Sequence, residues 1–312
     1  MTHDGKLLIV ANGDYVVFMD VNRMITGRGD PILGFLSDGA DSGSVYVNVT
    51  ADDKFLFVSD EGAETITVIN LQKARAEGFK ESAIVGKIPV GGAPIALTFS
   101  PDQKWLYTTS QIAPESLGWP IECKPEGEDP AKATPKYPKG AIIVIDVARA
   151  ETDPSHSVVA HVPAGCSPVR LAITPGGDSV FVTARNSNAL LGFETSKLIA
   201  DSSHALIGTV PVGASPVGVA VVNDGKLVIV TNSNRFSSDQ TVRQTLTVID
   251  ATKVNSSRAA VMGSIPAGVF PREFGTSPDG RMLYVANYGS KELEAIDLAR
   301  LPLERADAGV QR

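Results

Sequence analysis

The sequence has few of the features that would place it in several common classes of protein. Its 312 residues include only two cysteines and four histidines, with no pair at metal-ligand spacing, which argues against a zinc cluster. The longest apolar stretches, such as residues 7–10 and 141–145, are far shorter than the roughly 20 residues that span a bilayer. We therefore expect neither a zinc-cluster protein nor a membrane protein.

Clusters of positive charge and a leader sequence are also lacking. The net charge is −7, and no run of Lys and Arg occurs of the kind that neutralises a row of phosphates, so we expect no nucleic-acid partner. The chain does not start with a basic segment followed by an apolar one. This leaves a cytoplasmic protein or one whose leader has been removed. Hydrophobic residues make up 43% and charged residues 20%, which is typical of a folded protein.

What the chain does contain is an internal repeat. Six times a run of β-branched and aromatic residues ends at a hydrophobic residue followed by Asp, Asn or Glu, and most neighbouring copies lie about 50 residues apart. The six pairs are Met19-Asp20, Ile69-Asn70, Ile145-Asp146, Phe193-Glu194, Ile249-Asp250 and Ile296-Asp297. A period of that size predicts a propeller or a solenoid.

The composition of the strands favours the propeller. Residues 7–10, 55–58 and 142–145 are apolar almost throughout, which predicts sheets covered on both faces. The gaps between these runs are too short and too rich in Gly, Pro and Asp for crossover helices. We therefore predict one all-β domain over residues 1–312, a β-propeller of four-stranded antiparallel blades with six repeats.

Short phrases within the repeat support this fold. Residues 284–287 read Tyr-Val-Ala-Asn, 229–232 read Ile-Val-Thr-Asn, and 9–12 read Ile-Val-Ala-Asn, while Ser-Pro-Asp-Gly precedes the first of these at 277–280. They resemble the YVTN repeat, whose family adjoins the lactonase-like propellers. Residues 181–184 and 107–110 depart from the motif because they lack the Asn. The resemblance implies the fold and, more weakly, a lactonase-like activity.

The ends of the repeat array are irregular. The first copy starts at the turn before its second strand, at residues 4–6, so its innermost strand is missing. The tail, residues 302–312, would be at best a weak fourth strand. We interpret this as a protein that extends further upstream, or a ring that closes imperfectly; a seven-bladed parent is the alternative.

A candidate site comes from aligning the first strands of the repeats. One position in each should lie near the mouth of the central channel, and small or apolar residues occupy most of these positions. The polar exceptions are Tyr46, Arg170 and Glu273, with Asn48 two residues deeper. We predict that Arg170 stabilises an oxyanion and that Glu273 acts as a general base or as a metal ligand. The alternative is that Arg170 and Glu273 pair and only plug the channel.

Loops on the same face add candidate substrate-binding residues, some of which must simply cap turns. With Asn48 they are Asp60, Glu61, Trp119, Arg185, Asn232, Arg272 and Tyr288. His161 is a further candidate acid or base, although a lone histidine at a strand end more often has a structural role. A divalent cation such as Ca²⁺, held by oxygen ligands from several blades, is left open as a cofactor, although no EF-hand loop is present.

An insertion in the third repeat is the last distinctive feature. Residues 111–140 contain six prolines and are predicted to project from the top face, the face that bears the mouth of the central channel. They form either a stiff lid over the channel or a mobile loop exposed to solvent. Cys123 lies in this segment and Cys166 in the turn that enters the next repeat. We expect them to form a disulfide, which would imply a secreted or periplasmic protein.

Two functions are open at this point. The first is an enzyme that opens, closes or rearranges an oxygen-containing ring, with lactone hydrolysis as the most concrete reaction. The second is a non-catalytic propeller that binds a small molecule or a protein. The charged groups that converge beneath a lid favour the enzyme. The sequence does not predict the oligomeric state.

Overall fold

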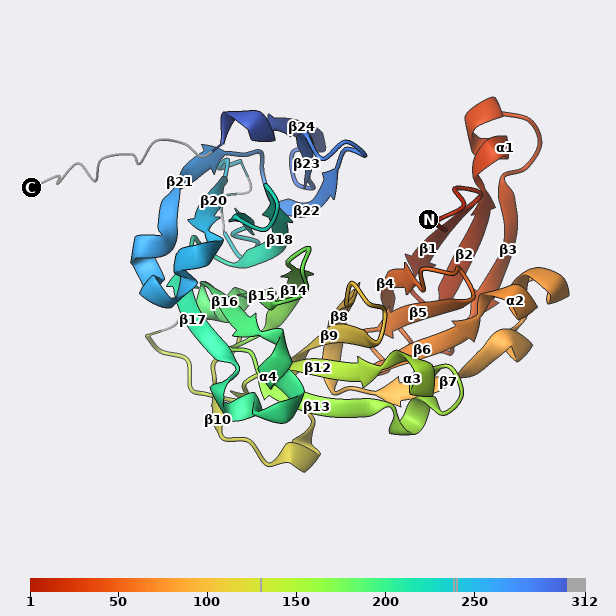
Figure 1. Cartoon of the computed structure of the whole chain (residues 1–312), viewed down its shortest axis with the longest axis horizontal. Helices are drawn as coiled ribbons and strands as arrows, with labels where there is room; N and C mark the ends of the chain where they lie inside the picture. The colour runs from red at the N-terminus through yellow and green to blue at the C-terminus, as the bar shows by residue number, and fades with distance from the viewer. Residues whose placement is uncertain (130, 238, 240, 302–312) are drawn as a thin grey trace, which may run out of the picture. The chain divides into compact units, whose positions relative to one another are not determined.

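The computed structural model describes residues 1–129, 131–237, 239 and 241–301 (Figure 1). Strands dominate the described residues, and they pair in antiparallel fashion. The predicted weak strand at residues 302–312 lies outside the described part of the chain. No helix among the described residues is long and apolar enough to cross a membrane.

The chain divides into two compact units. The first unit, Met1–Trp119 and Ala141–His161, holds three sheets. The first sheet is β1 (Leu7–Asn12), β2 (Tyr15–Asp20) and β3 (Ile32–Ser37); the second is β4 (Ser44–Val49), β5 (Phe55–Asp60), β6 (Thr65–Asn70) and β7 (Ile84–Pro89); the third is β8 (Gly92–Phe99), β9 (Trp105–Ile112), β12 (Ala141–Asp146) and β13 (Val158–Pro163), whose last residues belong to the second unit.

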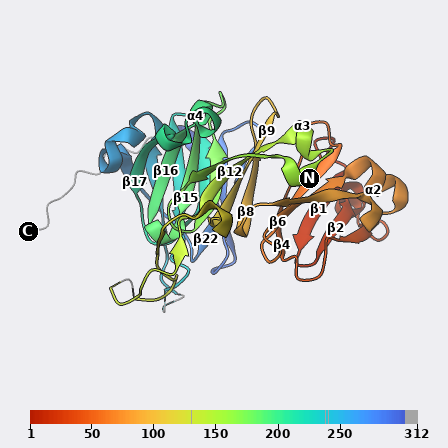
Figure 2. The same cartoon turned by 90° about the horizontal axis from the view of Figure 1, so that it is seen from below.

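The second unit, Pro120–Gly140 and Val162–Arg312, holds three larger sheets and one small one. The larger sheets are β14 (Pro168–Ile173), β15 (Ser179–Ala184), β16 (Ala189–Glu194) and β17 (Leu206–Pro211); then β18 (Pro216–Val222), β19 (Leu227–Asn232), β20 (Thr245–Asp250) and β21 (Val261–Pro266); then β22 (Pro271–Thr276), β23 (Met282–Asn287) and β24 (Glu292–Asp297). The small sheet is β10 (Ile121–Cys123) with β11 (Tyr137–Pro138). Figure 2 shows β15, β16 and β17 running side by side.

These sheets are the blades that the repeat predicts. The first has three strands in the order β1-β2-β3, which confirms that the first copy lacks its inner strand within the described residues. The strands that read as wholly apolar are buried: Leu56, Phe57 and Val58 of β5 have no exposed surface. Burial of both faces comes from packing on neighbouring blades, as where Phe57 joins a core cluster with Leu97 of β8.

The structure explains the six pairs that define the repeat, since each acidic or amide residue is the N-cap of a short helix after the third strand. Asp20, Asn70 and Asp146 accept a hydrogen bond from the backbone N–H three residues on, and Asp250 and Asp297 from the one two residues on. Glu194 makes no such bond. Capping satisfies an N–H that would otherwise have no partner. The helices are α1 (Val21–Thr26), α2 (Leu71–Glu77), α3 (Val147–Ala150), α4 (Thr195–Ala200), η6 (Ala251–Ala260) and η7 (Leu298–Arg300).

The remaining helices are single 3₁₀ turns in the connections. They are η1 (Glu81–Ala83), η2 (Glu115–Leu117), η3 (Pro154–His156), η4 (Arg185–Ser187) and η5 (Ser202–His204).

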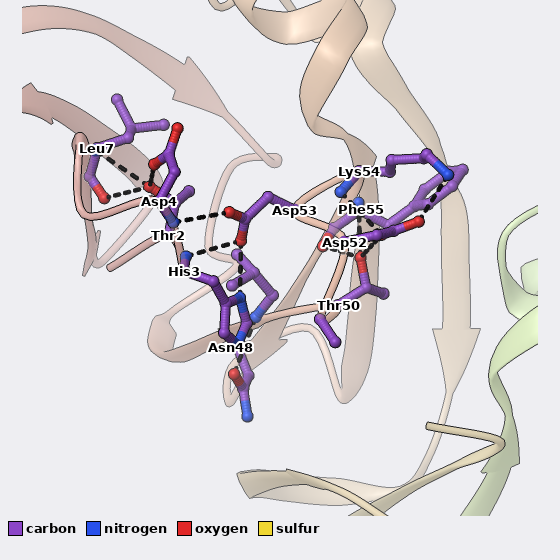
Figure 3. A network of polar contacts seen from close by, with 12 residues as sticks. Thr2, His3, Asp4, Leu7, Asn48, Thr50, Asp52, Asp53, Lys54 and Phe55 are labelled. Carbon is purple, nitrogen blue, oxygen red and sulfur yellow. Dashed lines mark hydrogen bonds and ion pairs between the residues drawn. The ribbon is translucent and has the colours of Figure 1, made fainter. Parts of the chain in front are cut away.

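The N-terminal segment of the first unit is tied to the turn between β4 and β5 (Figure 3). The backbone N–H groups of His3 and Asp4 donate to the Asp53 carboxylate, and His3 Nδ1 lies 2.8 Å from Asp53 Oδ1. Burial raises the pKa of Asp53, but the hydrogen bonds from His3 and Asp4 together outweigh it and hold the pKa below its ordinary value. In the same turn Asp52 binds Lys54, which with Thr50 lowers the pKa of Asp52 to about 2.

Candidate functional site

The first strand of each blade in the second unit carries a β-bulge near its start. The register shifts between Pro168 and Leu171 in β14, and between Pro216 and Val219 in β18. It also shifts after Pro271 in β22. Bulges re-aim side chains and are frequent beside functional sites. They occur at or beside the positions that the sequence alignment selected.

Threonines of the neighbouring second strands hold two of these bulges in place. Thr183 Oγ1 accepts a hydrogen bond from the Arg170 N–H at 3.2 Å and donates to the Val217 carbonyl of the next blade at 2.7 Å. Thr231 Oγ1 accepts from the Gly218 N–H at 2.7 Å. The Thr of the repeat motif therefore satisfies a backbone donor that the bulge removes from the ladder.

Arg170 and Glu273 meet across the first strands of two blades. Arg170 Nε and Nη2 lie 3.0 and 2.9 Å from the same carboxylate oxygen, Glu273 Oε2. The Arg170 side chain is 10% exposed and that of Glu273 is 43% exposed. A nearly buried guanidinium is thus held by a carboxylate that solvent can reach.

The strand between them carries a glycine at the equivalent position. β18 contacts both β14 and β22, and the three strands lie together in Figure 1. A Cβ on Gly218 would lie 2.7 Å from the Arg272 carbonyl oxygen and 3.2 Å from the Phe274 ring. Gly218 therefore allows β22 to approach closely, and a larger residue here would force the backbone of β18 or β22 to shift.

An aromatic and guanidinium cluster adjoins this pair. The Phe270 and Tyr288 rings meet edge to face with their centroids 5.6 Å apart, and the Arg272 guanidinium lies 5.9 Å from each. Tyr288 is 66% exposed. Arg272 is therefore oriented by cation–π contacts at the surface beside Glu273, where it could bind an anion.

Phe270 has a backbone conformation that is costly for a bulky residue. Its φ is +51°, and the residues that precede the first-strand proline in the other blades of this unit, Ser167 and Ser215, have φ of +52° and +47°. The fold requires this left-handed turn, and a phenylalanine at such a position costs of order 1–3 kcal/mol. The ring is accordingly placed against Tyr288 and Arg272 at the expense of stability.

This arrangement predicts different effects on stability and on binding. In Phe270→Gly the free energy of unfolding should stay within about 1 kcal/mol of the wild type, because relief of the left-handed strain offsets the lost ring contact. Ligand affinity at the cluster should fall. Denaturant unfolding measures the first effect, with Phe274→Ser as a control: that ring packs on a core cluster, so its loss should destabilise the unit by about 3 kcal/mol. If Phe270→Gly is destabilised as much as Phe274→Ser, the backbone of Phe270 is not strained.

The insertion is fastened to the same unit. We name residues 120–140 the strap. Cys123 forms a disulfide with Cys166, which confirms the pairing expected from the sequence. Two further contacts join the strap to the loop after β15: Arg185 binds Glu126 through Nε at 2.8 Å and Nη2 at 2.5 Å, and the Asn186 side chain donates to the Lys124 carbonyl at 2.6 Å.

The other predicted residue of this unit, Asn232, has a structural role. Its side chain accepts from the Gly213 N–H and donates to the hydroxyls of Thr245 and Thr247, each at 2.9 Å. A Cβ on Gly213 would collide with it. The Asn of the repeat motif thus ties the second strand to the third and to the preceding turn.

The remaining predicted residues belong to the first unit, so a site that they share with Arg170 stays a prediction. Tyr46 and Trp119 pack against a core cluster and Asn48 donates to the Leu97 carbonyl. Asp60 is completely buried, whereas Glu61 is exposed. Burial lowers the pKa of His161 in β13.

Sequence reasoning missed Phe270 and Glu126. The signal for Phe270 was its place in the repeat, because Ser167 and Ser215 precede the equivalent proline in the other two copies of this unit. Glu126 carried no signal, because its partner Arg185 lies 59 residues away in the sequence.

The fold matches that of known β-propeller proteins, which confirms the predicted fold class. Two solved structures, each titled a "putative 6-phosphogluconolactonase", come from Bacteroides fragilis (TM-score 0.67) and Bacteroides uniformis (TM-score 0.66). Both are 14% identical to this chain, and each match covers 95% of this chain and 78% of the other. A protein of unknown function from Desulfotomaculum acetoxidans is similar at a TM-score of 0.60 and 14% identity, covering 94% and 79% of the two chains.

Sequence comparisons add nothing to this likeness. No family model matches the chain, the YVTN repeat included, and no curated protein is significantly similar to it. At 14% identity the structural likeness establishes the fold alone.

Proposed function

We propose that this protein is a lactonase-like enzyme that opens an oxygen-containing ring at the Arg170–Glu273 pair. The observation that carries the proposal is a nearly buried guanidinium bound to a solvent-accessible carboxylate where bulged first strands meet. Paired charges at such a position favour a functional site. The likeness to two structures titled as lactonases supports the same reaction class.

In the proposed reaction the oxygen of a water molecule attacks the lactone carbonyl carbon while Glu273 accepts a proton from that water. The Arg170 guanidinium donates hydrogen bonds to the oxyanion that develops on the carbonyl oxygen. The ring C–O bond then breaks, and the ring oxygen takes the proton from Glu273 to give a hydroxy acid. Arg272 and Tyr288 would hold a polar or anionic part of the substrate.

The test is a turnover panel of neutral and anionic lactones and simple esters with purified full-length chain. Arg170→Ala should lower kcat/KM by about 10² to 10³, and Glu273→Gln by about 10² to 10⁴. The matched controls are Arg243→Ala and Glu292→Gln, because these residues form an exposed ion pair in the same unit and should leave turnover unchanged. Turnover that survives both site variants would refute the proposed site.

A chelator arm in the same panel tests the divalent cation. The described residues contain no group of three or more His, Cys, Asp or Glu side chains that could hold a metal ion. We propose Ca²⁺ only as a cofactor that binds in addition to the substrate. Loss of activity with chelator and recovery with added Ca²⁺ would support this cofactor.

A non-catalytic binding protein is the second candidate, favoured by the pairing of Arg170 with Glu273, which could simply close the channel. Saturable binding of gluconate or glucose 6-phosphate that depends on Arg272, with no turnover of any lactone, would support it. For either function we propose a secreted or periplasmic location, because the disulfide is compatible with an oxidising compartment.

A further inference from the structure

Two buried carboxyl groups of the first unit lie outside the proposed site. Asp38, which follows β3, is 2% exposed, and Asp60 at the end of β5 is fully buried. Ser42 and Ser44 donate to the two oxygens of Asp38 at 2.7 and 2.5 Å, and Ser44 Oγ also lies 3.2 Å from Asp60 Oδ1. One serine hydroxyl thus bridges the two acids but has only one proton to donate.

The other oxygen of Asp60 is bound by the third strand of its blade. Thr65 and Thr67 of β6 donate to Asp60 Oδ2 at 3.2 and 2.5 Å. Lys87 of β7 approaches the same oxygen at 3.7 Å from a side chain that is 36% exposed. Asp38 and Lys87 are the charged groups that act on Asp60 from the elements packed around it.

The internal repeat shows what this position requires. Asn232 ends β19 as Asp60 ends β5, and each contacts two threonines of the third strand. The Asn232 amide donates to Thr245 and Thr247, whereas Thr65 and Thr67 donate to Asp60. An amide presents one acceptor and one donor side, whereas an ionised carboxylate only accepts. A protonated carboxylic acid has the same donor and acceptor pattern as the amide. A protonated Asp60 would donate to one of its neighbouring hydroxyls, as the Asn232 amide does, instead of accepting from it.

We propose that Asp38 and Asp60 share one proton near neutral pH, and that its loss loosens the first two blades from one another. The same two serines connect the two acids to the first blade, at the turn between β1 and β2. Ser42 Oγ donates to the Gly13 carbonyl, and the backbone N–H and carbonyl of Ser44 pair with those of Gly13. With both acids ionised, two buried negative charges would face each other across Ser44.

Burial is the largest cause that raises the pKa of Asp60, and the charge of Asp38 adds to it, giving about 7 although Thr67 and Lys87 lower it. The folded chain then binds the proton more tightly than the unfolded chain, in which an aspartate titrates near 3.8. The stabilisation of the folded chain by this proton is complete below pH 3.8, declines as the pH rises towards about 7, and is absent above about pH 7.

Hydrogen exchange of the full chain, corrected for intrinsic rates, tests the proposal between about pH 5 and pH 7. In the wild type the protection of β4, β5 and β6 amides should fall by about tenfold for each pH unit. Asp60→Asn, which copies Asn232, should abolish this dependence and fold normally. Asp102→Asn, which alters an exposed turn carboxyl of the same unit, should retain it.

Two further measurements keep the proposal falsifiable. The reciprocal Asn232→Asp protein should acquire a pH-dependent loss of protection in β19 and β20, and the Asp60 carboxyl carbon should titrate near 7 by NMR. An Asp60 carboxyl that titrates near 4, or a pH dependence that Asp60→Asn leaves unchanged, would overturn the shared proton.

Discussion

Removal of the Cys123–Cys166 disulfide should lower the free energy of unfolding of the second unit by about 4 kcal/mol. The two cysteines are 43 residues apart in the sequence, and closing a loop of that size restricts the unfolded chain by about this amount. Denaturant unfolding of a Cys123→Ser, Cys166→Ser chain measures the loss. The same loss should follow reduction of the wild type with a thiol.

The control for this experiment lies within the strap. The Arg185–Glu126 ion pair should still hold residues 120–140 in the double serine variant, so its amide protection should fall but not vanish. An unfolding free energy within about 1 kcal/mol of the wild type would show that the disulfide does not constrain the unfolded chain as expected.

Loss of the Glu126 carboxylate should be nearly as harmful. The Arg185 side chain is only 7% exposed and that of Glu126 is 19% exposed, so Glu126→Ala leaves a desolvated guanidinium without its carboxylate partner. Removing one member of a buried ion pair typically costs about 3–5 kcal/mol. Thermal and denaturant unfolding should show a destabilisation near the lower end of that range, because the strap can move and admit water.

Two variants separate this ion pair from ordinary surface pairs. Glu292→Ala removes the carboxylate partner of Arg243, which is 61% exposed, and should leave the free energy of unfolding nearly unchanged. Arg185→Met together with Glu126→Leu should recover much of the loss, because no charge is then buried. Equal destabilisation by Glu126→Ala and Glu292→Ala would contradict the buried character of the Arg185 pair.

Much of the candidate site could be anticipated from the repeat. Aligning the first strands selected Arg170 and Glu273 as polar exceptions among small residues, and the structure brings them to 2.9 Å from each other. The cysteine pairing followed in the same way from the positions of Cys123 and Cys166 in the repeat. Repeats make such inferences feasible because equivalent residues occupy equivalent places in each blade.

Other residues could not be assigned, since their environment depends on distant parts of the chain. Asp60 reads as a loop-end carboxylate on a rim, yet it is fully buried among Ser44, Thr65 and Thr67. Asn232 reads as a ligand-binding residue, but its hydrogen bonds fix one blade internally. Burial and hydrogen-bond partners, which decide between these roles, are properties of the folded chain.

The sequence alone determined the class of fold, because apolar strands, turn residues and N-caps recur locally with one period. It also determined which residues break that period. The tertiary structure decided which of these residues meet: the pairing of Arg170 with Glu273, the fastening of the strap by Arg185 and Glu126, and the burial of Asp60 against Asp38. Such contacts join segments remote in sequence, and their energies depend on how far water is excluded.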